Sequence, residues 1–159
     1  YFSVFANGGK SIQPFFIEKI LKTGKEVQFL ENKKTNENFI ESWVGKKLPK
    51  EEIFTIDPRV SYIINDILLE ATRRGTGKKI QSLKRDDFAG KTGTTNDAES
   101  TWFTGFNKNI LTTVWFGYDQ PSTLGNKEFG SSTALPIWLD YMEDIIDDDE
   151  YGIQTRPSG

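Results

Sequence analysis

The residues of this chain that are best suited to chemistry form the string Lys91-Thr92-Gly93, with Thr94 directly after it. In such a string the lysine supplies a fixed positive charge for a carboxylate, and the threonine hydroxyl adds a short-range donor. The glycine lets a substrate lie flat against the backbone, because it has no Cβ. An exposed strand edge can bind an extended peptide as an added strand, and the amide of Thr94 can face a developing oxyanion. The string therefore predicts a receptor for an acyl donor that ends in a carboxylate.

The composition excludes several other kinds of active site. The 159 residues include no Cys and no His, which removes thiol nucleophiles, triads built on His and most zinc sites. The net charge of −3, without a basic stripe, argues against a nucleic-acid partner. With 36% hydrophobic and 27% charged residues the chain is typical of a globular domain. Without a run of about 18 apolar residues, or a basic segment followed by an apolar stretch at residue 1, we expect neither a membrane span nor a signal peptide within these residues.

Other segments admit competing interpretations. A second Lys-Thr-Gly string at residues 22–24 lies between two candidate strands and is typical of a hairpin turn. Residues 9–11 and 90–92 resemble the end of a P-loop, but in both cases the earlier glycine that this motif requires is replaced by another residue. Residues 75–79 combine glycines with lysines. They predict either an anion-binding nest or a basic loop after a helix, and we favour the loop.

Two amphipathic helices should frame the candidate site. The first begins at Asp57-Pro58, because Asp suits the N-cap and Pro the first helical position. Its apolar residues recur at helical spacing and predict one buried stripe: Val60, Ile63, Ile64, Ile67, Leu68 and Ala71. Gly75 is expected to close this helix in a left-handed conformation. The second helix should start at Pro136, with this apolar face: Ile137, Trp138, Tyr141, Met142, Ile145 and Ile146.

The remaining pattern predicts a helix end at residues 1–9 and several strands. Strands are expected over residues 11–20, 26–30, 101–106 and 110–118, with a hairpin turn at 107–109. This order of elements predicts an α+β fold with an antiparallel sheet flanked by helices. Residues 1–146 would form the domain, with 31–50 as a polar surface excursion. Residues 147–159 would form an acidic, mobile tail.

Three motifs together mark penicillin-binding proteins and class A β-lactamases: Ser-x-x-Lys, Ser-Asp-Asn or a variant of it, and Lys-Thr-Gly. Further segments, in the same order and with similar spacing, resemble the C-terminal part of the transpeptidase domain of class A (bifunctional) penicillin-binding proteins. These segments are residues 3–9, 74–77, 88–97, 102–106, 114–119 and 134–138. The resemblance covers most of residues 1–143, and the string Ala-Gly-Lys-Thr-Gly-Thr-Thr-Asn-Asp is its most specific part.

The resemblance implies the fold shared by penicillin-binding protein transpeptidases and serine β-lactamases, incomplete in this chain. It implies D,D-transpeptidation of peptidoglycan stem peptides ending in D-Ala-D-Ala, acylation by β-lactams, and no metal or cofactor. Lys91 would orient the substrate carboxylate and polarise the hydroxyl network, and Thr92 and Thr94 would bind the carboxylate beside Gly93. The parent protein would be anchored in the bacterial cytoplasmic membrane, face the cell wall and carry a glycosyltransferase domain as well.

The chain departs from the family pattern, because none of its serines has Lys three residues later or Asn two residues later. We therefore expect a fragment that lacks the nucleophile and is inactive alone, the nucleophile belonging to the missing N-terminal part of the same domain. Two alternatives stay open. One is a non-catalytic relative that binds peptidoglycan or a partner protein. The other is a serine β-lactamase, disfavoured by residues 74–77 and by the Trp-Phe strand.

Overall fold

A computed structural model describes residues 1–12, 21–22, 25–26, 55–146 and 151–158 of the chain. The chain divides into one unit of residues 1–10 and 54–159 and a second unit of residues 11–53. In the second unit β1 (Leu21–Lys22) and β2 (Lys25–Glu26) pair antiparallel, with Lys22 opposite Lys25. This pairing agrees with a hairpin at the first Lys-Thr-Gly string. The predicted excursion at 31–50 lies outside the described residues.

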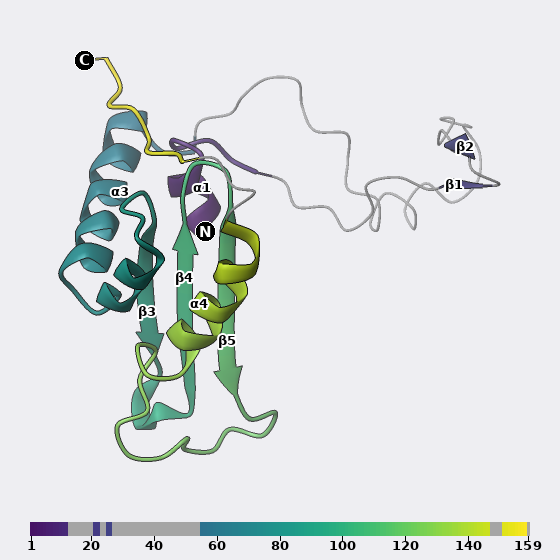
Figure 1. Cartoon of the computed structure of the whole chain (residues 1–159), viewed down its shortest axis with the longest axis vertical. Coiled ribbons are helices and arrows are strands. Elements are labelled where there is room, and N and C mark those ends of the chain that lie inside the picture. Colours follow the sequence, from purple (N-terminus) through teal and green to yellow (C-terminus); the bar gives the residue numbers. More distant parts are fainter. Residues whose placement is uncertain (13–20, 23–24, 27–54, 147–150, 159) are drawn as a thin grey trace. The chain divides into compact units, whose positions relative to one another are not determined.

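The first unit is built on an antiparallel sheet in the order β3-β4-β5 (Figure 1). Its strands are β3 (Ala89–Thr94), β4 (Ser100–Phe106) and β5 (Leu111–Gly117), so the strands predicted over residues 101–106 and 110–118 and their hairpin are confirmed. Most of the sequence predicted as strands over residues 11–20 and 26–30 lies outside the described residues. The turn between β4 and β5 is fixed by Asn107, whose side-chain oxygen accepts the N–H groups of Asn109 and Ile110 at 2.8 and 2.9 Å. The short helix η2 (Asn96–Ala98) connects β3 to β4.

Helices cover both faces of this sheet. On one face α4 (Ala134–Ile145) and the 3-10 helix η1 (Lys78–Leu83) pack Trp138 against Phe88 and Phe103, with ring centroids 5.5 and 5.3 Å apart. On the other face α1 (Phe2–Ala6) and α3 (Pro58–Arg73) pack against Ala89 and Phe106. The predicted α+β fold with an antiparallel sheet flanked by helices is thus confirmed.

The long helix α3 begins as predicted, but its buried face does not follow the predicted stripe. Asp57 caps the helix by accepting the N–H of Arg59 at 2.9 Å. Val60, Ile63 and Ile67 are 48, 57 and 58% exposed. Leu68 of the predicted stripe is buried, and Ile64 packs against the same core cluster. The other buried residues of the helix lie outside the stripe: Ser61, Asn65, Leu69 and Thr72. Helical spacing marks an apolar side of a helix, but it does not say which side the rest of this chain covers.

Gly75 also differs from the prediction, because the described glycines with positive φ are Gly8, Gly9 and Gly125. Arg74 ends α3 with φ −133°, and Gly75 lies so close to the helix that an added Cβ would sit 2.8 Å from the carbonyl oxygen of Ala71. Glycine is therefore required here for close packing and not for a left-handed turn.

Helix α4 is confirmed, although it begins at Ala134, two residues before Pro136. The proline stands in the first turn, where its missing N–H breaks no intrahelical bond. Of the predicted apolar face, Trp138 and Met142 are buried, whereas Ile137 and Tyr141 are exposed.

The predicted tail is described only from residue 151, since residues 147–150 lie outside the described part. The N–H of Gly152 donates to the carboxylate of Asp87 at 3.0 Å, and its carbonyl accepts the N–H of Lys108 at 3.2 Å. The amide of Gln154 donates to the carbonyl of Ala6 at 2.7 Å. Residues 151–158 therefore pack beside α1 and the β4–β5 turn, and mobility of the tail stays a prediction.

Candidate functional site

All four predicted site residues lie on β3, the strand at one edge of the sheet in Figure 1. Because side chains alternate along a strand, Lys91 and Gly93 belong to the face of Trp102, whereas Thr92 and Thr94 belong to the face of α4. Lys91 and Thr94 are exposed, and Thr92 and Gly93 are half-buried. The sequence-predicted residues are thus brought together as one continuous, accessible segment.

The ammonium group of Lys91 folds back onto its own strand. Its Nζ donates to the carbonyl of Thr92 at 2.8 Å and lies 3.5 Å from the Thr92 hydroxyl. Although the two side chains start on opposite faces of the sheet, their polar atoms meet at the edge of β3. A cation and a hydroxyl donor at this separation can together bind the two oxygens of one carboxylate.

The same contact indicates which backbone groups point away from the sheet. Within the described part of the chain β3 pairs only with β4, so its other edge has no strand partner. The carbonyl of Thr92 lies at that edge, because the exposed ammonium of Lys91 reaches it. In an antiparallel pair, every second residue directs both its N–H and its C=O to the same side. The backbone groups of Thr94 therefore point to the free edge as well, where an extended peptide can pair with them.

Two contacts that the sequence did not predict hold the threonine hydroxyls. The Thr92 hydroxyl donates to the hydroxyl of Thr76 at 2.9 Å, and the N–H of Gly130 donates to the hydroxyl of Thr94 at 3.2 Å. Gly130 is buried so tightly that an added Cβ would lie 2.5 Å from the carbonyl oxygen of Trp102. The motif Arg-Gly-Thr-Gly at residues 74–77 already contributed to the family resemblance. By contrast, no sequence pattern marked Gly130 as a neighbour of residues 91–94.

Gly93 has a packing reason to be glycine. An added Cβ would lie 3.2 Å from the Cβ of Trp102, its cross-strand neighbour. The rings of Trp102 and Trp115 are 6.3 Å apart on that face. The absence of a side chain at Gly93 therefore leaves room for this tryptophan pair, while room for a substrate stays a prediction.

The competing phosphate-binding interpretations gain no support from the geometry. Residues 90–92 lie inside β3 and not between a strand and a helix, as a P-loop requires. In residues 75–79, the N–H groups of Gly75 and Gly77 both donate to the carbonyl of Ala71, and that of Lys78 donates to Gly75. Amides committed to carbonyls in this way cannot form an anion nest, so the prediction of a basic loop agrees better with the structure.

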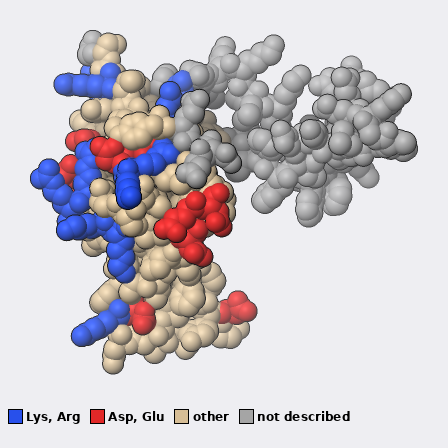
Figure 2. Space-filling model, in the orientation of Figure 1, with Lys and Arg blue, Asp and Glu red and all other residues tan. Residues whose placement is uncertain are grey.

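Charged side chains are distributed unevenly around β3. Figure 2 shows Lys and Arg gathered on the side formed by α3 and η1, whereas Asp and Glu gather over α4. The basic side includes Arg73, Arg74, Lys78 and Lys79, which precede β3 in the chain. Arg73 and Arg74 are paired with Glu70, at 3.4 and 3.2 Å, so part of this positive charge is neutralised locally.

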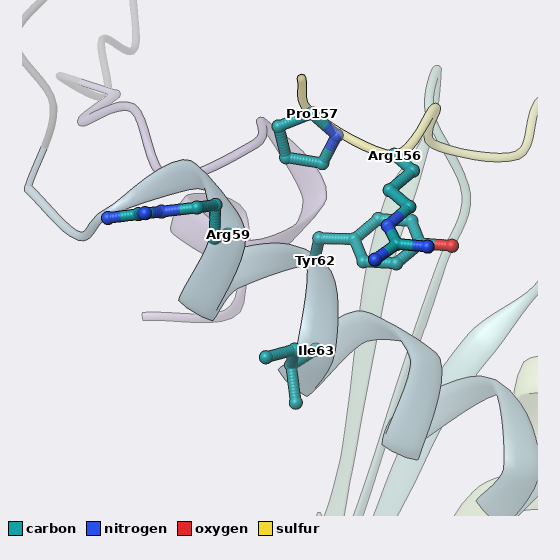
Figure 3. Close-up of a pocket in the computed structure, with 5 residues that line it drawn as sticks. All are labelled: Arg59, Tyr62, Ile63, Arg156 and Pro157. Atoms are coloured by element: carbon teal, nitrogen blue, oxygen red, sulfur yellow. The ribbon is translucent and has the colours of Figure 1, made fainter. Parts of the chain in front are cut away.

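A surface pocket of about 380 Å³ lies away from these residues (Figure 3). It is lined by Arg59, Tyr62 and Ile63 of α3 and by Arg156 and Pro157 of the C-terminal segment. Arg59 is engaged by Asp57, whose carboxylate it binds at 3.0 and 2.6 Å. The lining side chains of this pocket include two arginines and the Tyr62 phenol, but no carboxylate and no lysine. Among the described residues there is also no cluster of three potential metal ligands, and none of the described helices is long and apolar enough to cross a bilayer.

Comparison with known proteins agrees with the geometry. The family model "Penicillin binding protein transpeptidase domain" matches residues 1–143. Penicillin-binding protein 1A of Pseudomonas aeruginosa is 36% identical over 192 residues, which cover 99% of this chain and 23% of that protein. Penicillin-binding protein 1A of Neisseria lactamica is 37% identical over 141 residues, covering 89% of this chain and 16% of that protein.

A solved structure gives the same result. The crystal structure of penicillin-binding protein 1A from Haemophilus influenzae matches with a TM-score of 0.76 and 33% sequence identity. The match covers 98% of this chain and 27% of that one. The chain thus spans less than a quarter of the length of the two curated relatives named above.

Proposed function

Because this chain belongs to the penicillin-binding protein transpeptidase family, we propose that it is the C-terminal part of a peptidoglycan D,D-transpeptidase. In this proposal residues 91–94 bind the terminal carboxylate and the backbone of a stem peptide ending in D-Ala-D-Ala. The observation that carries the proposal is the meeting of the Lys91 ammonium and the Thr92 hydroxyl at the free edge of β3.

The reaction proceeds through a serine supplied by the rest of the parent protein. The serine oxygen bonds to the carbonyl carbon of the penultimate D-Ala, the peptide bond breaks, and the terminal D-Ala leaves with the transferred proton. An amine of a neighbouring stem then attacks the ester, which forms the cross-link and returns the serine hydroxyl. The outward-facing amide of Thr94 donates to the oxyanion that develops in both steps.

The same geometry accepts a β-lactam. Such a drug carries a carboxylate near a strained amide, so Lys91, Thr92 and Thr94 would hold it as they hold the stem peptide. Its ring opens onto the serine without releasing a leaving group, and the acyl-enzyme therefore persists. We further propose that the parent protein is anchored in the bacterial cytoplasmic membrane, with this domain facing the cell wall.

Labelling with fluorescent penicillin tests the proposal. The full-length parent protein should become covalently labelled, and excess unlabelled penicillin should prevent the labelling. Replacement of the serine of its Ser-x-x-Lys motif by alanine should abolish it. A parent that keeps this motif and takes up no label is a non-catalytic relative that binds peptidoglycan or a partner protein. Rapid turnover of penicillin would instead indicate a β-lactamase.

A further inference from the structure

A second threonine lies against the proposed carboxylate site from outside β3. Thr76, in the connection between α3 and η1, has its hydroxyl oxygen 2.9 Å from that of Thr92. The two residues are 16 positions apart in the sequence, so the loop geometry and not chain neighbourhood brings them together. Because the Lys91 ammonium lies 3.5 Å from the Thr92 hydroxyl, the three polar groups form a continuous chain.

The surrounding backbone fixes the place of Thr76. The N–H of Gly77 donates to the carbonyl of Ala71 at 3.0 Å, and an added Cβ at Gly77 would lie 3.2 Å from the Cγ2 of Thr72. The hydroxyl of Thr72 in turn donates to the carbonyl of Phe88 at 2.7 Å, directly before β3 begins. The connection is therefore held at the end of α3, and α3 is tied to the strand that carries the site.

On the basis of the proposed function, we infer that Thr76 is a positioning residue that orients the Thr92 hydroxyl toward the carboxylate of the substrate. Each hydroxyl has one proton and two lone pairs, so a hydroxyl pair shares one proton and keeps the other for a ligand. In the structure the single proton of the Thr92 hydroxyl is donated to Thr76. When a carboxylate lies beside Lys91 and Thr92, both hydroxyls rotate, so that Thr76 donates to Thr92 and Thr92 donates to the carboxylate. Thr76 then fixes the rotamer of Thr92 and polarises its O–H group.

The first test replaces Thr76 in the full-length parent protein and measures the second-order rate constant of acylation by fluorescent penicillin. Thr76→Val keeps the shape of the side chain but removes the hydroxyl. Acylation should slow about three- to tenfold, the range expected for one net hydrogen bond. Thr76→Ser restores the hydroxyl and should stay within about twofold of wild type. A Thr76→Val protein within twofold of wild type contradicts the inference.

A double-mutant cycle separates positioning from a general structural effect. If Thr76 acts through Thr92, adding Thr76→Val to a Thr92→Val protein should slow acylation by less than about twofold. Equal slowing in both backgrounds would show that Thr76 affects acylation by another route, and it would overturn the inference.

Thr113→Val provides the matched control, because it also removes one of two paired hydroxyls. The Thr113 hydroxyl lies 3.0 Å from that of Thr104 on the sheet. This variant should be acylated at the wild-type rate, and the melting temperatures of all variants should agree. If the wild-type parent is not labelled at all, the proposed function fails and the inference fails with it. If the wild type is labelled and the cycle is additive, only the inference fails.

Discussion

Lys91 carries the only formal charge within residues 91–94, so it should dominate binding of a carboxylate. Lys91→Ala removes this charge from beside the Thr92 hydroxyl and should slow acylation of the parent protein more than ~100-fold, as loss of one preorganised electrostatic group does. The measurement is the rate of fluorescent penicillin labelling. Lys22→Ala is the matched control, because Lys22 opens the other Lys-Thr-Gly string but pairs in the hairpin of β1 and β2. Labelling of the Lys91→Ala protein within threefold of wild type would refute the role given to this lysine.

Asp87 should make the stability of the domain sensitive to acid. Burial raises the pKa of this carboxyl, but hydrogen bonds from Arg85, Gly152 and Asn107 outweigh burial, so the pKa lies below its ordinary value. A carboxyl whose pKa is lower in the folded state stabilises the fold above its unfolded pKa, which is about 3.9. This contribution is lost as the pH falls toward the folded pKa.

The variant Asp87→Asn tests this linkage in the parent protein. It removes the buried carboxylate that binds the partly buried guanidinium of Arg85 and should lower the free energy of unfolding at pH 7 by about 3 kcal/mol. Its stability should also fall less than that of wild type between pH 5 and pH 3. The control is Asp66→Asn, which makes the same change at an exposed position of α3. Thermal unfolding across this pH range measures both effects. Equal acid sensitivity of the Asp87→Asn and wild-type proteins would show that ionised Asp87 does not contribute to this pH dependence of stability.

Among the elements, the strands and helices could be located from sequence because their signals are local. Asp57 with Pro58 marks the start of α3, and alternating aromatic and β-branched residues mark β4 and β5. The buried side of α3 could not be predicted, because it depends on which parts of the domain lie against the helix. The string 91–94 could be proposed as a site from its residue types alone. The contact between Thr76 and Thr92 required the position of a loop that no local pattern encodes.

The C-terminal segment of residues 151–158 contacts Asp87 and Lys108, and its docking can be tested at Gly152. An added Cβ there would lie 2.8 Å from the Cβ of Lys108, so Gly152→Val should displace the segment and break its bonds to Asp87 and Lys108. Hydrogen exchange of the parent protein should then show faster exchange at the amides of residues 108 and 152. Thr155→Val, at an exposed position of the same segment, should leave both amides protected. Unchanged protection in the Gly152→Val protein would show that the segment is not held by these contacts.

Taken as a whole molecule, the chain leaves surfaces that its own described elements do not cover. The outer edge of β5 has no strand partner in the described part of the chain, and Trp102 and Trp115 on the sheet are 44 and 46% exposed. Val60, Ile63 and Ile67 present a further apolar face on α3. The matched chain of the solved relative is several times longer, because this chain covers 27% of it.

We therefore predict that the isolated 159-residue chain does not fold stably. An unpaired edge strand beside exposed aromatic side chains favours association between chains, and the apolar area left in water removes part of the driving force for folding. Thermal or urea unfolding of the pure peptide should show a gradual change in circular dichroism, with light scattering that increases with concentration. The full transpeptidase domain measured in parallel should unfold cooperatively. A sharp, concentration-independent transition of the peptide would contradict the prediction, because it would show that β3, β4 and β5 form a sufficient core with α3 and α4 alone.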